Sequence, residues 1–582
     1  MQTFSKKLIR FIQKPAFLAF VYFAGMSIVM TSPLILKMRT EAIGAGGGDG
    51  TYFIWLVAWY QKALFQLKIS PFIAPALNYP QGWNLATTDI TPAMVALALP
   101  GSLLFGPTWG FNFAMLLSFI ISGWGMYLWV KHLTDDTFSG LVAGTVFAFL
   151  PFRMVHFLVG HLSLAGTQWF PFYFWGLFDL LTQEKFSWKP VLMAGIAAGL
   201  IGMTSPYYVY MTILISGVFL VGFIIFKGYK RLKFAAFWKS LLAFGLLAGL
   251  LVGLSMLPYL RLNAENGLAS RSVDYLNRYS ASPTDYVIPS IKQFLWGKWI
   301  DNTFSPEIFQ ESTLYIGAVA FVLAVFAWIK RRQLRHPELA DIAILVAAAG
   351  FVLSLGIQLH WLGKIVVSLP RFLQLILHRT HMPVIYLPAY YLSRYLPFFS
   401  KMRVMMRFGL FTLIFSSLLA GLGAYLLTKS ASSKVKRWVG VTLLVLIFID
   451  FYPGVLKDFR PTQVRPVDNW LAAQSNTGAM AQFPFNEESS QGLVYDTLVN
   501  QKPFLGGYFN ANSPEQYSRI FPVMNTFPSQ KSVSLLTQLG VTYVVVDSSQ
   551  YRNFLDIDQK IQLLGLKLLN VSGNEYVYGL IK

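Results

Sequence analysis

The sequence of 582 residues contains no cysteine. That absence excludes disulfide bonds, thiolate zinc sites, thiol nucleophiles and iron–sulfur clusters. Any chemistry that the protein performs therefore relies on carboxylates, histidine, arginine, lysine, tyrosine, serine or threonine.

Charged residues are scarce as well, at 13% of the chain, whereas soluble domains carry roughly 25%. Hydrophobic residues make up 55%, and the mean hydropathy is +0.51. These values exclude an ordinary soluble globular protein, and 16% aromatic residues exclude a disordered chain. The composition predicts a polytopic α-helical membrane protein.

The first apolar run covers residues 17–36 and follows four basic residues. About 20 apolar residues can cross a hydrocarbon layer of roughly 30 Å. Lys37 and Arg39 follow without a small-residue cleavage motif, which favours a retained helix over a signal peptide. The basic residues before the run place the N-terminus inside.

Further apolar runs bring the prediction to about 11 transmembrane helices. The additional runs are 111–130, 138–152, 163–182, 190–205, 207–226, 240–260, 313–329, 339–356, 404–428 and 438–452. Basic clusters follow in the short loops that this count places inside, so the positive-inside rule is satisfied repeatedly. These clusters are Lys227/Lys230/Arg231/Lys233/Lys239, Lys330/Arg331/Arg332/Arg335 and Lys429/Lys434/Lys436/Arg437.

One apolar run, 92–105, breaks the pattern because counting it as a span would place every later basic loop outside. The run is about 14 residues long, and Pro100 and Gly101 interrupt it. We interpret it as an interfacial or re-entrant segment. The net charge, 47 − 26 = +21, then reflects mainly membrane topology, and we expect no nucleic-acid partner.

The predicted topology leaves long segments outside and only short ones inside. Residues 1–452 form the transmembrane domain with outer loops 37–110, 261–312 and 357–403, and residues 453–582 form an outer α/β domain. In this tail, strands are expected at 479–485 and 541–547, a helix at 489–500, and a hairpin around 572–574.

The first outer loop combines a glycine-rich turn, 44–50, with an aromatic stretch, 51–67. We expect this stretch to form a helix that lies along the membrane, with its aromatic side chains at headgroup level. The aromatic residues concerned are Trp55, Trp59, Tyr60 and Phe65 in the stretch and Trp83 further along the loop.

Two carboxylates in this loop are candidates for chemistry. The glycines around Asp49 allow its carboxylate to approach a ligand, although Asp49 could instead cap a helix that begins near Thr51. Asp89 precedes the run 92–105, where capping is slightly favoured over a second catalytic carboxylate. Two carboxylates in one pocket could divide the roles of base and ligand.

Another polar cluster falls at the outer junction between two predicted spans. Polar side chains at that depth cost free energy unless they have hydrogen-bonding or charged partners. The cluster contains four of them, namely Arg153, His156, His161 and Gln168. The two histidines are five residues apart, and Gly160 is expected to break the helix between them, so a two-histidine metal face is disfavoured. The alternative is that the histidine and arginine side chains snorkel to water.

Two further sites border spans. Glu311 lies directly before the run 313–329. Arg403 and Arg407, at i and i+4, are expected on one helical face, where they could grip a lipid phosphate or simply anchor to headgroups.

The pattern resembles the GT-C class of membrane glycosyltransferases, within it the aminoarabinose and protein O-mannosyl transferases, and also YfhO-like bacterial membrane proteins. The resemblance rests on Asp49 in the first outer loop, the interfacial helices after it, the segments NFAMLLSFIISGWGMYLWVKHL and LVAGTVFAFLPFR, the HFLVGHL turn, and a long outer loop before Thr313. It departs from the O-mannosyl pattern in lacking an Asp-Glu pair after the first span, and His161 stands where relatives often have an acidic residue.

The resemblance implies transfer of a sugar from a polyprenyl-phosphate-linked donor to a lipid, glycan or protein acceptor at the outer face of a bacterial cytoplasmic membrane. It makes Asp49 the expected general base and Arg403 and Arg407 the expected donor-phosphate ligands. No cofactor is established, and a divalent cation stays open. A transporter or a non-catalytic assembly protein is the alternative. The full candidate set is Asp49, Asp89 and His161 as catalytic residues, and Arg153, His156, Gln168, Glu311, Arg403 and Arg407 as donor or acceptor ligands.

Overall fold

The structure is a computed structural model. It describes residues 14–44, 48–266, 271–366, 386–462, 464–486, 492–509 and 513–580. Several features considered above lie outside these residues, namely most basic residues before the first span, the centre of the glycine-rich turn, the middle of loop 357–403, and the start of the helix expected at 489–500.

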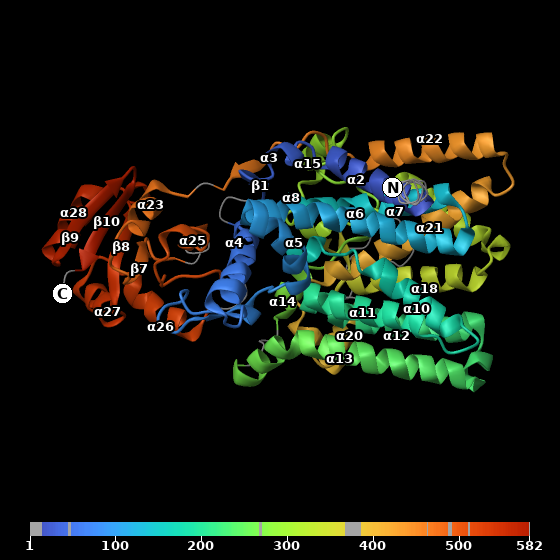
Figure 1. Cartoon of the computed structure of the whole chain (residues 1–582), viewed down its shortest axis with the longest axis horizontal. Coiled ribbons are helices and arrows are strands. Elements are labelled where there is room, and N and C mark those ends of the chain that lie inside the picture. Colours follow the sequence, from blue (N-terminus) through green and yellow to red (C-terminus); the bar gives the residue numbers. More distant parts are fainter. Residues whose placement is uncertain are drawn as a thin grey trace, which may run out of the picture. The chain divides into compact units, whose positions relative to one another are not determined.

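The chain divides into two compact units (Figure 1). A helical unit comprises Met1–Ile35, Met115–Phe157 and Leu164–Leu456. A mixed unit comprises Leu36–Ala114, Leu158–Ser163 and Lys457–Lys582. The first expected outer loop and the C-terminal tail therefore belong to one unit, whereas the sequence treats them as separate regions.

The helical unit contains most of the apolar helices, in the order α2 (Pro15–Met30), α6 (Pro107–Thr134), α7 (Thr137–Phe149), α8 (Pro151–Leu158), α9 (Leu162–Ala165), α10 (Phe170–Thr182), α11 (Trp188–Thr204), α12 (Pro206–Lys227), α13 (Ala235–Asn266), α14 (Val273–Arg278), α15 (Gly297–Phe304), α16 (Phe309–Ser312), α17 (Ala318–Ile329), α18 (Pro337–Ser354), α20 (Pro388–Tyr395), α21 (Gly409–Thr428) and α22 (Ser433–Phe451). Short 3₁₀ helices η4 (Pro283–Tyr286) and η7 (Met405–Phe408) lie between them.

Six helices in the described part of the chain are long and apolar enough to cross a membrane, fewer than the eleven expected. They are Pro107–Thr134, Thr137–Leu158, Pro206–Lys227, Ala235–Ala264, Pro337–Ser354 and Met405–Thr428, and each overlaps a predicted span. Shorter apolar helices cover Pro15–Met30, Pro92–Phe105, Trp188–Thr204 and Ala318–Ile329.

Two predicted spans are interrupted. The run 17–36 is not one helix, because α2 ends at Met30 and Pro33, which has no backbone N–H to donate, separates it from α3 (Leu34–Lys37). The run 163–182 yields a full helix only from Phe170 onward, and the short α9 precedes it.

Helix α21 lies at the centre of the helical unit. Its span is 89% buried, whereas only 11% of the α13 span is buried. Glycine allows close packing around α21: a Cβ at Gly421 would lie 2.6 Å from the Ala143 Cβ atom, and one at Gly423 would lie 2.1 Å from the Leu323 carbonyl oxygen. Small residues at helix contacts are typical of membrane bundles, where backbones approach closely.

The mixed unit is built around a four-stranded sheet in the order β7-β8-β10-β9, formed by β7 (Ala479–Phe483), β8 (Val541–Asp547), β9 (Leu566–Ser572) and β10 (Glu575–Leu580). Strands β7 and β8 are parallel, and the other pairs are antiparallel. The predicted strands and the hairpin around 572–574 are confirmed. Of the helix expected at 489–500, only α25 (Thr497–Asn500) is present in the described residues, while α23 (Pro466–Ala472), α26 (Glu515–Met524), α27 (Gln530–Gln538) and α28 (Phe554–Leu563) were not predicted.

The first loop is joined to the tail by backbone pairing within the mixed unit. Strand β1 (Glu41–Ile43) pairs with β6 (Phe459–Pro461), and the backbone N–H of Phe504 donates to the Ala76 carbonyl at 2.7 Å. Helices α4 (Asp49–Gln61) and α5 (Pro92–Phe105) follow β1, and α5 has the predicted bounds with Pro100 inside it.

The prediction of an aromatic belt in this loop is wrong for most of its residues. Trp55, Trp59, Tyr60 and Trp83 are buried, and only Phe65 is exposed. The reason is that the rings pack on one another, as in the parallel stack of Trp55 and Trp59 with centroids 6.0 Å apart.

Candidate functional site

The geometry of the site begins with two glycines. Gly44 and Gly160 have φ angles of +69° and +76°, in the left-handed region that favours glycine. A Cβ at Gly44 would lie 2.4 Å from the Val159 carbonyl carbon, and one at Gly160 would lie 2.6 Å from the Gly50 Cα atom. The backbone of the first loop and the turn after α8 therefore touch, and neither position has room for a side chain.

This contact places His161 beside Asp49. The Nε2 atom of His161 lies 2.6 Å from the Oδ2 atom of Asp49, and the two side chains are 15% and 30% exposed. Asp49 is the first residue of α4, and Gly48 is the N-cap, so the interpretation of Asp49 as a cap for a helix starting near Thr51 is wrong. At the helix N-terminus, the carboxylate is stabilised by the positive end of the helix dipole.

Asp89 lies in the same unit and is held from the same turn. The Ser163 hydroxyl donates to its Oδ2 atom at 2.7 Å. The N-cap of α5 is Thr91, so Asp89 does not cap that helix, contrary to the interpretation slightly favoured from the sequence. The turn 158–163 therefore contacts both carboxylates, Asp49 through His161 and Asp89 through Ser163.

Tyr52 completes this group, which we name the carboxylate cluster: Asp49, Tyr52, Asp89, His161 and Ser163. The Tyr52 hydroxyl is 2.8 Å from the Thr88 hydroxyl and donates to the Asp89 carbonyl at 3.3 Å. Burial raises the pKa of Tyr52 far above its ordinary value, and the charges of Asp89 and Asp49 raise it further. Tyr52 therefore stays protonated and acts as a hydrogen-bond donor beside two carboxylates.

Sequence reasoning missed Tyr52, Thr88 and Ser163. Each is a common residue in an apolar or polar stretch, and nothing in its spacing distinguishes it from its neighbours. Aromatic rings back the cluster on one side, with Tyr508 stacked on Tyr52 at 4.6 Å between centroids and 10° between planes.

Arg153, His156 and Gln168 belong to the helical unit and are fully buried. The Arg153 guanidinium donates to the Ala148 carbonyl at 2.5 Å and to the Ser118 hydroxyl at 2.7 Å, and it lies 4.7 Å from the centre of the Phe119 ring. The alternative that the arginine and histidine side chains snorkel to water does not hold for Arg153 and His156, because both are fully buried. Arg153 instead links helices by satisfying carbonyls that the break between α7 and α8 leaves open.

Glu311 and Arg407 form a buried ion pair in the helical unit. The Arg407 Nη2 atom donates to Glu311 Oε1 at 2.5 Å, and Nε lies 3.2 Å from both carboxylate oxygens. The guanidinium also covers the Tyr207 ring, 4.9 Å from its centre. The Arg407 side chain is only 9% exposed and the Glu311 side chain only 5%.

Arg403 does not share a helical face with Arg407, contrary to the i, i+4 expectation. Val404 between them is extended, and a helical turn, η7, begins only at Met405. Arg403 lies 5.6 Å from the centre of the Tyr279 ring, and Arg271 lies 5.4 Å from that of Tyr275. We name Arg271, Tyr275, Tyr279 and Arg403 the arginine–tyrosine cluster.

No group of three or more histidine, aspartate or glutamate side chains that could hold a metal ion is found within the described residues.

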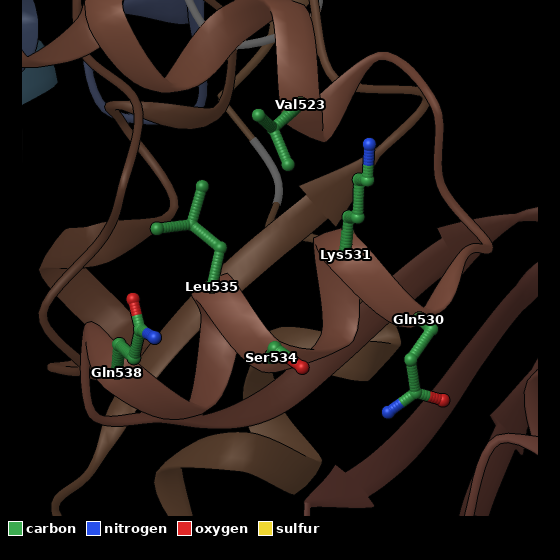
Figure 2. A pocket seen from close by; sticks show the side chains of 6 residues that line it. All are labelled: Val523, Gln530, Lys531, Ser534, Leu535 and Gln538. Atoms are coloured by element: carbon green, nitrogen blue, oxygen red, sulfur yellow. The ribbon is translucent and has the colours of Figure 1, made fainter.

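A hollow of about 390 Å³ lies elsewhere in the mixed unit. Figure 2 shows its lining, which comes from α26 and α27 and consists of Val523, Gln530, Lys531, Ser534, Leu535 and Gln538. It contains no carboxylate or histidine, so it offers no base for a transfer reaction.

The described structure resembles solved membrane glycosyltransferases of the GT-C class. It superimposes on the oligosaccharyltransferase of Archaeoglobus fulgidus in the apo form with a TM-score of 0.51 and 12% sequence identity, covering 92% of this chain and 70% of that one. The same enzyme in complex with an inhibitory peptide and a dolichol-phosphate gives a TM-score of 0.50 at 12% identity, covering 97% and 74%. The arabinofuranosyltransferase AftD from Mycobacteria gives 0.56 at 13% identity, covering 96% of this chain and 41% of that one.

At these identities the likeness establishes the fold: the chain has a GT-C-like membrane architecture. Residues 20–380 match the family described as Domain of unknown function (DUF6311), and the chain belongs to that family. No curated protein matches the sequence.

Proposed function

We propose that this protein is a membrane glycosyltransferase that moves a sugar from a polyprenyl-phosphate-linked donor to an acceptor hydroxyl at the outer face of a membrane. The observation that carries the proposal is the carboxylate cluster, in which Asp49 meets His161 at 2.6 Å and Asp89 accepts from Ser163 at 2.7 Å. The GT-C-like fold supports it, as does the complex of one relative of similar fold with dolichol-phosphate.

In the proposed reaction Asp49 acts as general base. Its carboxylate takes the proton of the acceptor hydroxyl, the hydroxyl oxygen forms a bond to the anomeric carbon, and the bond from that carbon to the donor phosphate oxygen breaks. The phosphate leaves with the electron pair, and a single displacement inverts the anomeric centre. Asp49 suits this role because its carboxylate is partly exposed while His161 fixes its orientation.

The other members of the carboxylate cluster position the reacting groups. Asp89 accepts from the Ser163 hydroxyl at 2.7 Å, which fixes the position of its carboxylate within the cluster. Tyr52 is buried, and its hydroxyl donates to the Asp89 carbonyl, so it holds Asp89 in place. The partly exposed Asp49 carboxylate is the acceptor that the cluster offers to a substrate hydroxyl.

For the donor phosphate, we propose Arg403 as the ligand in the helical unit, with Arg407 in support. Arg407 is already neutralised by Glu311, so its main role is to hold η7 and thereby the backbone next to Arg403. Arg403 sits among tyrosines, whose hydroxyls add donors suited to a phosphate. Arg403→Ala should weaken binding of a polyprenyl-phosphate, and unchanged affinity would remove this assignment.

The test of the function is transfer of labelled sugar from a polyprenyl-phosphate donor by the purified full chain. We expect Asp49→Asn to lower turnover by at least about 10²-fold, with Asp556→Asn, a change of an exposed carboxylate on α28, as the matched control. Equal turnover of wild type and Asp49→Asn would overturn Asp49 as the base. A wild-type protein that binds the donor but transfers no sugar to any acceptor would instead indicate a transporter or an assembly protein.

A further inference from the structure

A group of large apolar side chains is exposed in the segment between α13 and α17. Phe294, Leu295, Trp296 and Trp299 are 47%, 52%, 58% and 61% exposed. Single exposed apolar residues are common, but four within six consecutive positions form a contiguous surface that usually meets a partner or a membrane. We name residues 294–299 the aromatic loop.

The aromatic loop has a defined conformation. The Gln293 side chain accepts from the backbone N–H groups of Leu295 and Trp296 at 2.7 and 2.8 Å, and it donates to the Ile449 carbonyl at 2.9 Å. The Phe294 N–H donates to the Tyr452 carbonyl at 3.1 Å. These bonds fasten the loop to the end of α22, so its apolar side chains are held outward rather than left free to collapse inward.

The surface continues along α22. Val441, Val445 and Ile449 are 43%, 50% and 39% exposed and recur every four residues, which places them on one face of the helix. Helix α22 is not among the six candidate spans, but this exposed apolar face has the character of a helix surface that contacts lipid. The Phe294 ring packs against Tyr452 at 5.4 Å between centroids, so the aromatic loop extends this face past the last turn of α22.

The chemistry of the loop fits the border between hydrocarbon and headgroups. Tryptophan concentrates at that depth because its ring is apolar and its indole N–H is polar. Lys298 is exposed between the two tryptophans and could reach lipid phosphates, and Asp301, two residues after Trp299, lies opposite Trp299 on α15.

We propose that the aromatic loop inserts into the headgroup layer of the bilayer at the end of α22 and anchors the segment between α13 and α17 to the membrane. The partner is the lipid surface itself, and neither the catalytic proposal nor the orientation of the protein enters the argument.

The absence of cysteine makes the test direct, because each single cysteine is the only labelling site. Trp299→Cys and Leu295→Cys are labelled with an environment-sensitive fluorophore, with Asp301→Cys and Glu307→Cys as exposed controls on the same segment. The full chain is placed in nanodiscs of phosphatidylethanolamine and phosphatidylglycerol in equal parts, which expose both leaflets to water. Quenching is measured with spin-labelled lipid and with aqueous iodide.

We expect labels at 295 and 299 to be quenched by the spin-labelled lipid at least about twofold more than the controls, and to be shielded from iodide. Quenching by iodide without quenching by lipid would overturn the proposal. Shielding from both quenchers would also overturn it, since the loop would then be covered by protein, and dependence on protein concentration would identify a second copy as the cover. Gel filtration of each variant confirms that it folds.

Discussion

The Nε2 atom of His161 lies 2.6 Å from the Oδ2 atom of Asp49, although the two residues are far apart in the sequence. The pair exists because Gly44 and Gly160 let two backbone segments touch. The turn that carries His161 also carries Ser163, which binds the second carboxylate, Asp89. One short turn thereby sets the geometry of both acids.

The contact between Gly160 and Gly50 gives the first prediction. Gly160→Ala places a Cβ 2.6 Å from the Gly50 Cα atom at a φ of +76°, so the turn must move away from the first loop. We expect the variant to lose at least about 2 kcal/mol of stability and to lose most sugar transfer, because Asp49 and Asp89 both lose their partners. Thermal unfolding and transfer assays on the purified protein measure the two effects.

Gly573→Ala is the matched control in the same unit. Gly573 has a φ of +63° but nothing within 4 Å of a Cβ, so only the backbone strain applies. We expect a loss of about 1 kcal/mol and normal transfer. If the two variants behaved alike, the close approach at Gly160 would not be what positions the site.

The second prediction concerns His161 as the residue that orients Asp49. His161→Ala should lower kcat by about 10–100-fold while leaving the KM for the donor nearly unchanged, because the base remains but its orientation is lost. His132→Ala is the control, since His132 is also paired with an aspartate, Asp179, at 3.5 Å in the helical unit. A matching fall in kcat for both variants would mean that the effect is not specific to the carboxylate cluster.

The third prediction compares a buried ion pair with an exposed one. Glu311→Gln leaves the Arg407 charge buried without its counterion, so we expect a loss of about 3–5 kcal/mol of stability. Glu307→Gln breaks an exposed pair, in which the Arg278 side chain is 58% exposed and the Glu307 side chain 73%. This change should leave the unfolding midpoint almost unchanged. Thermal unfolding in detergent measures both, and a small effect of Glu311→Gln would show that water enters the buried site.

The fourth prediction follows from Arg465, which meets three carboxylates: Asp468 at 2.8 Å, Asp496 at 3.1 Å and Glu575 at 2.8 Å. Burial, and next the charge of Asp468, raise the pKa of Asp496 to about 7, although Arg465 opposes the shift. The folded state therefore holds this proton more tightly than the unfolded state, in which the pKa is near 3.8.

The sign of the pH dependence follows from this difference. The contribution of protonated Asp496 is complete below about pH 4, declines as the pH rises, and is gone above about pH 7. The Asn side chain of Asp496→Asn does not titrate. Relative to this variant, wild type should lose about 1–3 kcal/mol of unfolding free energy as the pH rises from about 4 to about 7. Unfolding midpoints of the two proteins at several pH values test this, and a constant difference between them would contradict a raised pKa for Asp496.

The sequence located local features well where a single physical signal dominates. Each of the six candidate spans overlaps a predicted run, since about 20 apolar residues are a strong signal by themselves. The helix 92–105 and the strand 541–547 have the predicted bounds. The helix break at Gly160 is likewise confirmed, since α8 ends at Leu158 and α9 begins at Leu162.

The sequence was misleading wherever partners come from distant segments. Asp49 and Asp89 look like helix caps locally, but their carboxylates bind His161 and Ser163. Trp55 and Trp83 look like interfacial anchors, but they pack against each other, with centroids 6.2 Å apart, inside the mixed unit. Trp296 and Trp299, by contrast, are exposed, in an outer loop where the sequence analysis singled out no aromatic residue.

The amino-acid sequence by itself determined that this protein is a membrane protein without thiol chemistry, because composition and apolar run length act residue by residue. Only the tertiary structure decided which polar side chains form a site. Pairing between Asp49 and His161 depends on a backbone approach that two glycines permit, and such an approach has no local signature. The tertiary structure also distinguishes two arginines that look alike in the sequence. Arg153 donates to a backbone carbonyl inside the helical unit, whereas Arg403 lies beside a tyrosine ring outside the spans.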